Sequence, residues 1–138
     1  MESVMAKHRL EEARVARLAT IGDDGRPHIV PIAFVIEGDT LYFAVDAKPK
    51  QTKNLKRLKN IAANPAVAVL VDHYEDDWTR LWWVRVDGTA LVVADGVLAR
   101  GAIDRLVDKY VQYRNARPEG PVVAIHIDRV TGWSFTSV

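Results

Sequence analysis

The sequence of 138 residues contains no cysteine, few serines and no long hydrophobic run. Without cysteine, the chain cannot form disulfides, a thiolate nucleophile, a zinc ribbon or a cysteine-ligated iron–sulfur cluster. The serines, Ser3, Ser134 and Ser137, all lie near the chain ends, which argues against a serine hydrolase triad. No apolar run approaches the roughly 18 residues that span a bilayer. We therefore expect neither a membrane protein nor a serine or cysteine hydrolase.

The sequence also shows neither a metal-binding motif nor a secretion signal. His8, His28, His73 and His126 show no HExxH or other close ligand spacing, so no metal site is predicted. The residues up to Arg17 are charged throughout and contain no apolar segment of a secretion signal. Together with the lack of cysteine, this N-terminus predicts a cytoplasmic protein.

Charge is nearly balanced, with 19 Lys and Arg against 18 Asp and Glu and a formal net charge of +1. The balance hides a segregation, because six basic residues and no acidic residue lie between Lys48 and Lys59. The rest of the chain carries 13 basic against 18 acidic residues. An acidic body repels a long polyanion. We therefore expect no nucleic acid partner and a compact anionic ligand at the basic segment.

Hydrophobic patterning predicts a mainly β (α+β) fold in one domain, 1–138. Strands are expected over residues 17–21, 27–36, 40–45, 66–71, 81–93 and 122–130, and helices over 3–14, 50–58 and 96–114. The strand over 27–36 is apolar on both faces, so it is expected to be buried on both. Because strands and helices do not alternate, a small antiparallel barrel with packed helices fits better than a parallel sheet.

The basic segment Lys48-Pro49-Lys50-Gln51-Thr52-Lys53-Asn54 falls between the third predicted strand and the following helix. A helix N-terminus offers unpaired N–H groups and the positive end of the helix dipole, and the lysines add charge. The segment is either a phosphate-binding site or a solvated lysine face. The lack of interleaved acids, and charge that begins before the helix, favour the anion site.

Tryptophan is abundant for this length, with Trp78, Trp82, Trp83 and Trp133. Trp82 and Trp83 are neighbours on a strand, so their side chains point to opposite faces. They cannot both fill one core. One of them therefore needs a different contact: a second subunit, a planar ligand, or an open end of the barrel that its side chain covers.

The order and spacing of these segments resemble the pyridoxamine 5′-phosphate oxidase-like split β-barrel family of flavin and deazaflavin proteins. The matching segments are Ala16 to Ile21, Gly25 to Ile32, Leu41-Tyr42-Phe43 and the lysine-rich helix start. The stretch from Trp82 to Ala90 resembles the actinobacterial branch of coenzyme F420-dependent enzymes. The resemblance covers nearly the whole chain and implies a six-stranded antiparallel split β-barrel with short packed helices.

The resemblance also implies a homodimer with two cofactor sites at the subunit interface. The cofactor-binding residues that it implies are His28, Val30, Pro31 and Ile32 beside the ring, Lys48, Lys50, Thr52, Lys53 and Asn54 at the phosphate, and Trp78 or Trp83 from the other subunit. It assigns no catalytic side chain. Here every charge from Lys48 to Lys53 is a lysine, which lacks the bidentate fork of the arginine common in FMN-binding members.

The implied reaction is hydride transfer between coenzyme F420 and a small conjugated or unsaturated substrate. FMN is the alternative cofactor. Coenzyme F420 has a phosphodiester and a carboxylate-rich tail, so positive charge that continues to Lys56, Arg57 and Lys59 suits it slightly better than FMN. Two other interpretations stay open: an FMN-dependent oxidase or reductase, and a protein that binds a flavin, a deazaflavin or haem without turnover.

Overall fold

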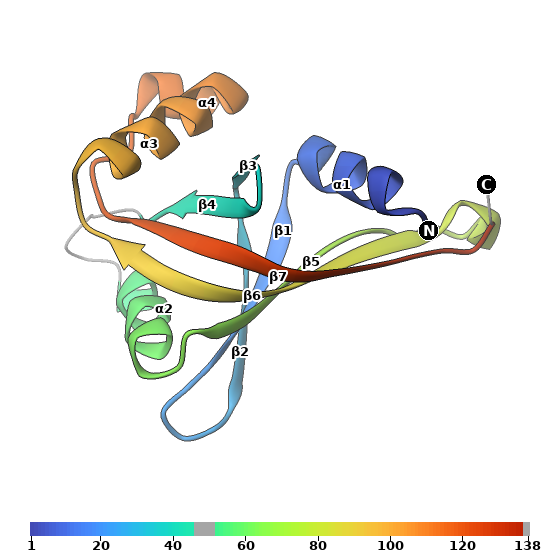
Figure 1. Ribbon diagram of the computed structural model, residues 1–138, viewed down its shortest axis with the longest axis horizontal. Coiled ribbons are helices and arrows are strands. Elements are labelled where there is room, and N and C mark those ends of the chain that lie inside the picture. The colour runs from blue at the N-terminus through green and yellow to red at the C-terminus, as the bar shows by residue number, and fades with distance from the viewer. Residues whose placement is uncertain (46–51, 137–138) are drawn as a thin grey trace.

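Seven strands form one sheet in the described residues, 1–45 and 52–136 of a computed structural model (Figure 1). The strand order is β2-β1-β5-β6-β7-β4-β3, and every neighbouring pair is antiparallel. The strands are β1 (Ala16–Ile21), β2 (Pro27–Ile32), β3 (Val35–Glu37), β4 (Thr40–Ala44), β5 (Ala66–His73), β6 (Trp82–Val93) and β7 (Val122–Ser134). The helices are α1 (Ser3–Glu12), α2 (Thr52–Ala63), α3 (Val97–Lys109), α4 (Val111–Asn115) and the short 3-10 helix η1 (Trp78–Arg80).

The prediction of a mainly β antiparallel fold with short helices is confirmed, but the prediction of six strands is wrong. The segment expected to form one strand over 27–36 is two, because β2 pairs with β1 and β3 pairs with β4 at the opposite edge of the sheet. The backbone N–H of Phe34, between them, donates to the Tyr110 hydroxyl at 3.0 Å. Within the described residues, no hydrogen-bonded ladder joins β2 to β3, so the sheet is open. Its two edge strands are connected only by the backbone that runs from β2 to β3.

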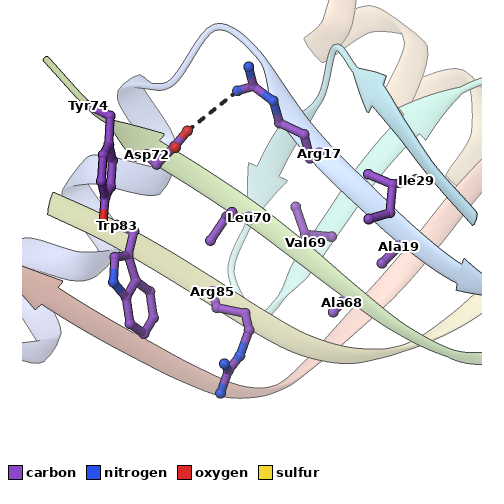
Figure 2. A pocket seen from close by; sticks show the side chains of 10 residues that line it. All are labelled: Arg17, Ala19, Ile29, Ala68, Val69, Leu70, Asp72, Tyr74, Trp83 and Arg85. Atoms are coloured by element: carbon purple, nitrogen blue, oxygen red, sulfur yellow. Dashed lines mark hydrogen bonds and ion pairs between the residues drawn. The ribbon is translucent and has the colours of Figure 1, made fainter. Parts of the chain in front are cut away.

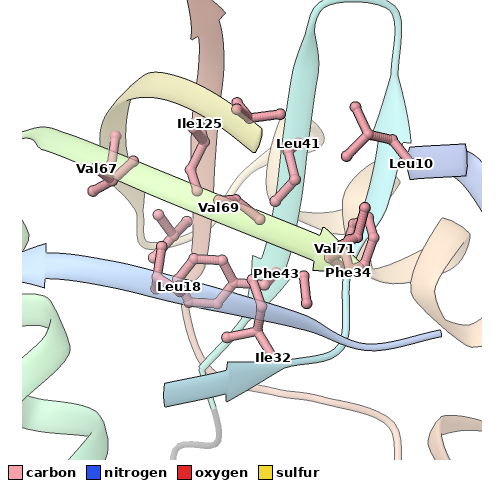
Figure 3. Close-up of a cluster of buried hydrophobic side chains, with 14 of the residues drawn as sticks. Leu10, Leu18, Ile32, Phe34, Leu41, Phe43, Val67, Val69, Val71 and Ile125 are labelled. Carbon is pink, nitrogen blue, oxygen red and sulfur yellow. The ribbon is translucent and has the colours of Figure 1, made fainter. Parts of the chain in front are cut away.

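Large apolar side chains fill the inner face of the sheet (Figure 3). Alternation along β4 turns Leu41 and Phe43 inward, where they are at most 1% exposed. Val69 and Val71 of β5 meet them from across the sheet. Further contacts come from Leu10 of α1 and Ile61 of α2. The two helices therefore help to cover the interior that the open sheet leaves uncovered.

A second apolar cluster lies between the other face of β4 and helix α3. Tyr42 alternates with its inward-facing neighbours and packs with Ile103 and Leu106. The helix expected over 96–114 ends early, because Tyr110 has extended backbone angles and separates α3 from α4. Both helices lie on this side of the sheet in Figure 1. Among the described residues, no helix is long and apolar enough to cross a membrane.

Candidate functional site

Strand β2 lies at one edge of the sheet and carries a histidine, His28, whose Nδ1 atom has no hydrogen-bonding partner among the described residues. Its prolines fit this place, because Pro31 has no N–H to donate and edge strands tolerate that loss. His28 is paired in register with Thr20 of β1. Its Nδ1 atom is buried and makes no hydrogen bond to any described residue. Buried polar atoms of folded proteins nearly always have a partner, so this nitrogen is a candidate for one that the described residues do not supply.

Helix α2 meets this edge through a buried polar contact. Asn60, 5% exposed, donates from Nδ2 to the Thr20 hydroxyl over 3.1 Å. Since Thr20 lies opposite His28 in the ladder, α2 and β2 flank the same corner of the sheet. Pro65 follows soon after the helix and lacks the N–H that a further turn would need.

The remaining predicted residues of β2 differ in exposure. Val30 is half-buried against the core, and Ile32 is 5% exposed and belongs to the core cluster. Pro31 is exposed. Ile29 is 64% exposed, so the expectation that this strand is buried on both faces is wrong for the single chain. The outward face of β2 is apolar and uncovered.

The predicted phosphate residues fall at the start of α2. Thr52, Lys53 and Asn54 form its first turn, which contains no acidic residue. Backbone N–H groups of a first turn have no partner inside the helix. Lys48 and Lys50 lie outside the described residues. Further along α2, the Arg57 Cζ atom stands 5.9 Å from the centre of the Phe43 ring, and burial lowers the pKa of this guanidinium.

A cavity of about 690 Å³ opens on the outer face of the sheet (Figure 2). Its lining consists of Arg17, Ala19, Ile29, Ala68, Val69, Leu70, Asp72, Tyr74, Trp83 and Arg85. These residues come from β1, β2, β5 and β6, together with Tyr74 just after β5. The volume lies in the range of small-molecule sites. The structure thus brings Trp83 together with the uncovered face of β2.

Charged groups surround this apolar surface. Arg17 Nη1 lies 3.5 Å from Asp72 Oδ1 across the β1–β5 pair (Figure 2). Arg85 lies with its Cζ atom 5.8 Å from the centre of the Trp83 ring. Its Nε atom is buried and makes no hydrogen bond to the described residues, since the nearest recorded carboxylate oxygen, on Asp87, is 3.6 Å away. One arginine of the cavity is therefore only loosely paired.

Trp78 does not line this cavity. It belongs to η1, and its side chain is 66% exposed. The helix begins where Asp77 accepts hydrogen bonds from the Thr79 N–H at 3.1 Å and the Thr79 hydroxyl at 2.6 Å. These bonds hold the pKa of the Asp77 carboxyl below its usual range. Of the two predicted tryptophans, the structure therefore places only Trp83 in the cavity.

Sequence reasoning missed most of the cavity lining. Arg17, Leu70 and Arg85 were not candidates, because each sits in a strand whose other face supplies the core. A signal was present in β5, where Ala66, Ala68 and Leu70 are also apolar on the side opposite to the buried valines. An antiparallel strand that is apolar on both faces differs from the usual pattern of one apolar and one polar face, and this difference was the signal for a second apolar surface.

The fold of the described residues is an open, seven-stranded antiparallel sheet of split-barrel type with flanking helices, and comparison with known proteins gives its family. The model of the pyridoxamine 5′-phosphate oxidase family matches residues 5–134. The chain belongs to this family, so the resemblance seen in the sequence is confirmed at the level of the family. No curated protein sequence matches it.

Solved structures show the same fold. The conserved hypothetical protein Rv2991 of Mycobacterium tuberculosis has a TM-score of 0.81 at 19% identity, over 100% of this chain and 92% of that chain. An FAD-binding protein of Mesorhizobium loti has a TM-score of 0.76 at 23% identity, over 96% and 92%. The haem storage protein HutZ of Vibrio cholerae has a TM-score of 0.73 at 16% identity, over 96% and 93%.

Proposed function

We propose that this protein is a cytoplasmic homodimeric oxidoreductase that uses coenzyme F420 to reduce a small conjugated or unsaturated substrate. One observation carries the proposal: α2 begins at Thr52, directly after the lysine-rich segment, and its first turn contains no acidic residue. An anionic cofactor is favoured at such a helix start by both charge and unpaired N–H groups. Membership of a family named for a phosphate-carrying substrate supports the same assignment.

The residues present fit a ring with a phosphate-bearing side chain. The buried, unpaired Nδ1 of His28 supplies one polar contact at the edge of the sheet, and Val30 supplies an apolar surface beside it. The start of α2, with Thr52, Lys53 and Asn54, would hold the phosphate. Bound there, a deazaflavin or flavin supplies the hydride chemistry.

The chain's own contribution is to bind, orient and shield. The apolar side chains of β2 exclude water from one side of the ring, which strengthens every polar contact within the site. His28 can accept or donate a hydrogen bond at Nδ1, depending on its protonation. Thr52, Lys53 and Asn54 would neutralise and hold the phosphate, and this anchor would fix the position of the ring attached to it. These roles need neither a nucleophile nor a metal among the described residues.

Charge along α2 supports coenzyme F420 over FMN. The exposed Lys56 and Lys59 continue the positive charge beyond the first turn of the helix. FMN ends at its phosphate, whereas coenzyme F420 continues into a carboxylate-rich tail. Additional cations beyond the phosphate therefore stabilise coenzyme F420 more than FMN.

The uncovered face of β2 supports the homodimer. Ile29 is 64% exposed, and the cavity beside it is lined mainly by apolar side chains, including Leu70 and Trp83. A second copy would bury this face, and Trp83 of the partner would then lie near the ring. This arrangement gives a partner to the tryptophan that the core does not accommodate.

Charge reversal at the start of α2 tests the proposal. Lys53→Glu should weaken coenzyme F420 binding by at least about tenfold, because it replaces an attractive charge by a repulsive one. The melting temperature of the ligand-free protein should change little. Arg100→Glu, an exposed charge reversal on α3, is the matched control and should bind coenzyme F420 like the wild type. Equal effects of both variants on binding would contradict the proposed site.

Two rival functions have specific support from structures of the same fold. The likeness to an FAD-binding protein favours a flavin enzyme, for which the purified protein would be yellow. The likeness to a haem storage protein favours binding without turnover. Tight ligand binding without hydride transfer to any quinone or enone acceptor would support this second rival.

A further inference from the structure

A second cavity, of about 460 Å³, lies at the end of the molecule away from α2. It is formed where α1, η1 and the ends of β5, β6 and β7 come together, near the N-terminus in Figure 1. None of its lining residues belongs to the proposed cofactor site. Its size suits a small metabolite.

Arg9 of α1 lines this cavity without an anionic partner. Its guanidinium stacks on Trp82, with Cζ 4.7 Å from the ring centre. Its Nε atom is buried and makes no hydrogen bond, and Arg9 forms no ion pair with the carboxylates of residues 1–45 and 52–136. Buried donors are nearly always paired in folded proteins, so an arginine held in this way by an aromatic ring is ready to receive an acceptor.

A second arginine enters the cavity from η1. Arg80 donates from Nε to Glu75 Oε2 at 3.1 Å, while its side chain stays 67% exposed. The same Glu75 oxygen bonds to His73, and this bond and the Arg80 charge keep the pKa of the Glu75 carboxyl below its usual range. No Asp or Glu among the described residues belongs to the cavity lining itself. Two carboxylates, Glu75 and Asp77, thus offset the charge of Arg80, whereas Arg9 keeps its charge without a carboxylate partner among the described residues.

The hydroxyl groups of the cavity are already committed as donors. Thr136 donates to the carbonyl of Thr79 at 3.2 Å, and Ser134 donates to the carbonyl of Thr136 at 2.9 Å. Donors toward a ligand therefore come from the arginines, and the hydroxyl oxygens can still accept. This combination suits an oxyanion that also carries a hydroxyl group.

We propose that this cavity binds a small phosphate monoester, with the phosphate between Arg9 and Arg80. Two guanidinium groups from different elements can approach a tetrahedral dianion from two sides, and the planar fork of arginine matches its oxygens. The site is independent of the proposed cofactor site, because the two share no residue. Occupation would join α1 to η1 and so stabilise this end of the molecule.

Titration of the full-length protein with glycerol 3-phosphate, followed by calorimetry and tryptophan fluorescence, tests this site. The wild type should bind it saturably and show a rise in melting temperature, in contrast to sodium chloride at equal ionic strength. Arg9→Met keeps apolar contact with Trp82 and should weaken binding by at least about tenfold. Arg80→Gln should weaken binding as well, and it provides the test if Arg9→Met fails to fold. Arg100→Gln should bind like the wild type.

Three outcomes would overturn the assignment. Binding that survives both Arg9→Met and Arg80→Gln would show that the cavity is not the site. Binding that is lost in Lys53→Glu instead would place the phosphate at α2. Inorganic phosphate and succinate are titrated in the same way. An affinity for succinate equal to that for glycerol 3-phosphate would show general anion binding, not recognition of a phosphate.

Discussion

Tyr110 holds together three segments that are distant in the sequence. Its hydroxyl accepts a hydrogen bond from the Phe34 N–H at 3.0 Å and lies 3.1 Å and 3.0 Å from the carbonyl oxygens of Phe34 and Arg14. The single hydroxyl proton goes to one of the two carbonyls at a time. Tyr110 thereby replaces the strand partner that Phe34 lacks between β2 and β3. Burial raises the pKa of this hydroxyl.

Tyr110→Phe should lower the free energy of unfolding by about 1–3 kcal/mol, because it leaves a buried N–H without an acceptor. Chemical denaturation measures this loss. Tyr74→Phe, which removes a hydroxyl from a side chain of a residue that is 63% exposed, should stay within about 0.5 kcal/mol of the wild type. An unchanged stability of Tyr110→Phe would show that Phe34 finds another partner.

Lys109 makes the stability depend on alkaline pH. Its Nζ donates to the carbonyls of Ala13 at 2.8 Å and Phe34 at 2.9 Å, and burial, with the nearby Arg14 charge second, lowers its pKa to about 8. An unfolded lysine titrates near pH 10.4, so between these values the unfolded chain binds more protons than the folded one. The contribution of Lys109 to stability should therefore rise as the pH increases from about 8 to 10.

Melting curves of the wild type and Lys109→Met across this pH range test the effect. The melting temperature of the wild type relative to Lys109→Met should increase from pH 7.5 to pH 10. Subtracting the melting temperature of the variant at each pH removes the contribution of the other lysines and tyrosines, because Lys109→Met contains the same groups. A constant difference across the range would mean that Lys109 titrates normally in the folded protein.

At the scale of elements, the long β6–β7 pair depends on a glycine. The register shifts between Asp87 and Gly88, which is the mark of a β-bulge. A Cβ atom at Gly88 would lie 2.5 Å from Ile125 Cγ2 and 2.7 Å from the carbonyl oxygen of His126. These distances are too short for real contacts, and one of the two atoms belongs to the backbone.

Gly88→Ala should therefore destabilise the protein by about 1–3 kcal/mol, the usual cost of overpacking. Gly101→Ala is the matched control in α3, where a Cβ would meet nothing within 4 Å and alanine is the better helix former. It should stabilise the protein by about 0.5–1 kcal/mol. Chemical denaturation of both variants measures the difference, and equal stabilities would show that the bulge relaxes freely.

The sequence predicted most elements but not where two of them break. Residues 27–36 are apolar at almost every position and contain no turn residue where β2 ends, so local pattern cannot show the break at Ala33 and Phe34. Residues 96–114 likewise keep helical spacing through Tyr110. The two breaks meet in one contact between residues 76 positions apart, the hydrogen bond from the Phe34 N–H to the Tyr110 hydroxyl. Such tertiary contacts are absent from local periodicity.

Only the part of the candidate site that is contiguous in the sequence could be predicted directly. The basic segment is contiguous in sequence, so its charge and its place before α2 could be read directly. The outer cavity is assembled from four strands, and Arg17 and Leu70 meet there only through sheet pairing. The unpaired state of His28 depends on its tertiary surroundings in the same way.

At the scale of the whole molecule, the outer sheet face should control assembly. Ile29→Arg places a charge on this face and should weaken the proposed homodimer by at least about tenfold, because buried charges at an interface are costly. Val97→Arg is the control, since Val97 is 80% exposed at the start of α3 and lies outside both the sheet and the cavity lining. Sedimentation velocity over a range of concentrations measures the effect. A wild type that is monomeric at all concentrations would contradict the dimer.

Cofactor choice is the central claim, and titration of the purified wild type with coenzyme F420 and with FMN tests it most directly. Saturable quenching of coenzyme F420 fluorescence is expected, with a dissociation constant lower than that for FMN. Tighter binding of FMN than of coenzyme F420 would mean that the cofactor is a flavin and not a deazaflavin. No spectral change and no measurable affinity for either ligand would contradict the account.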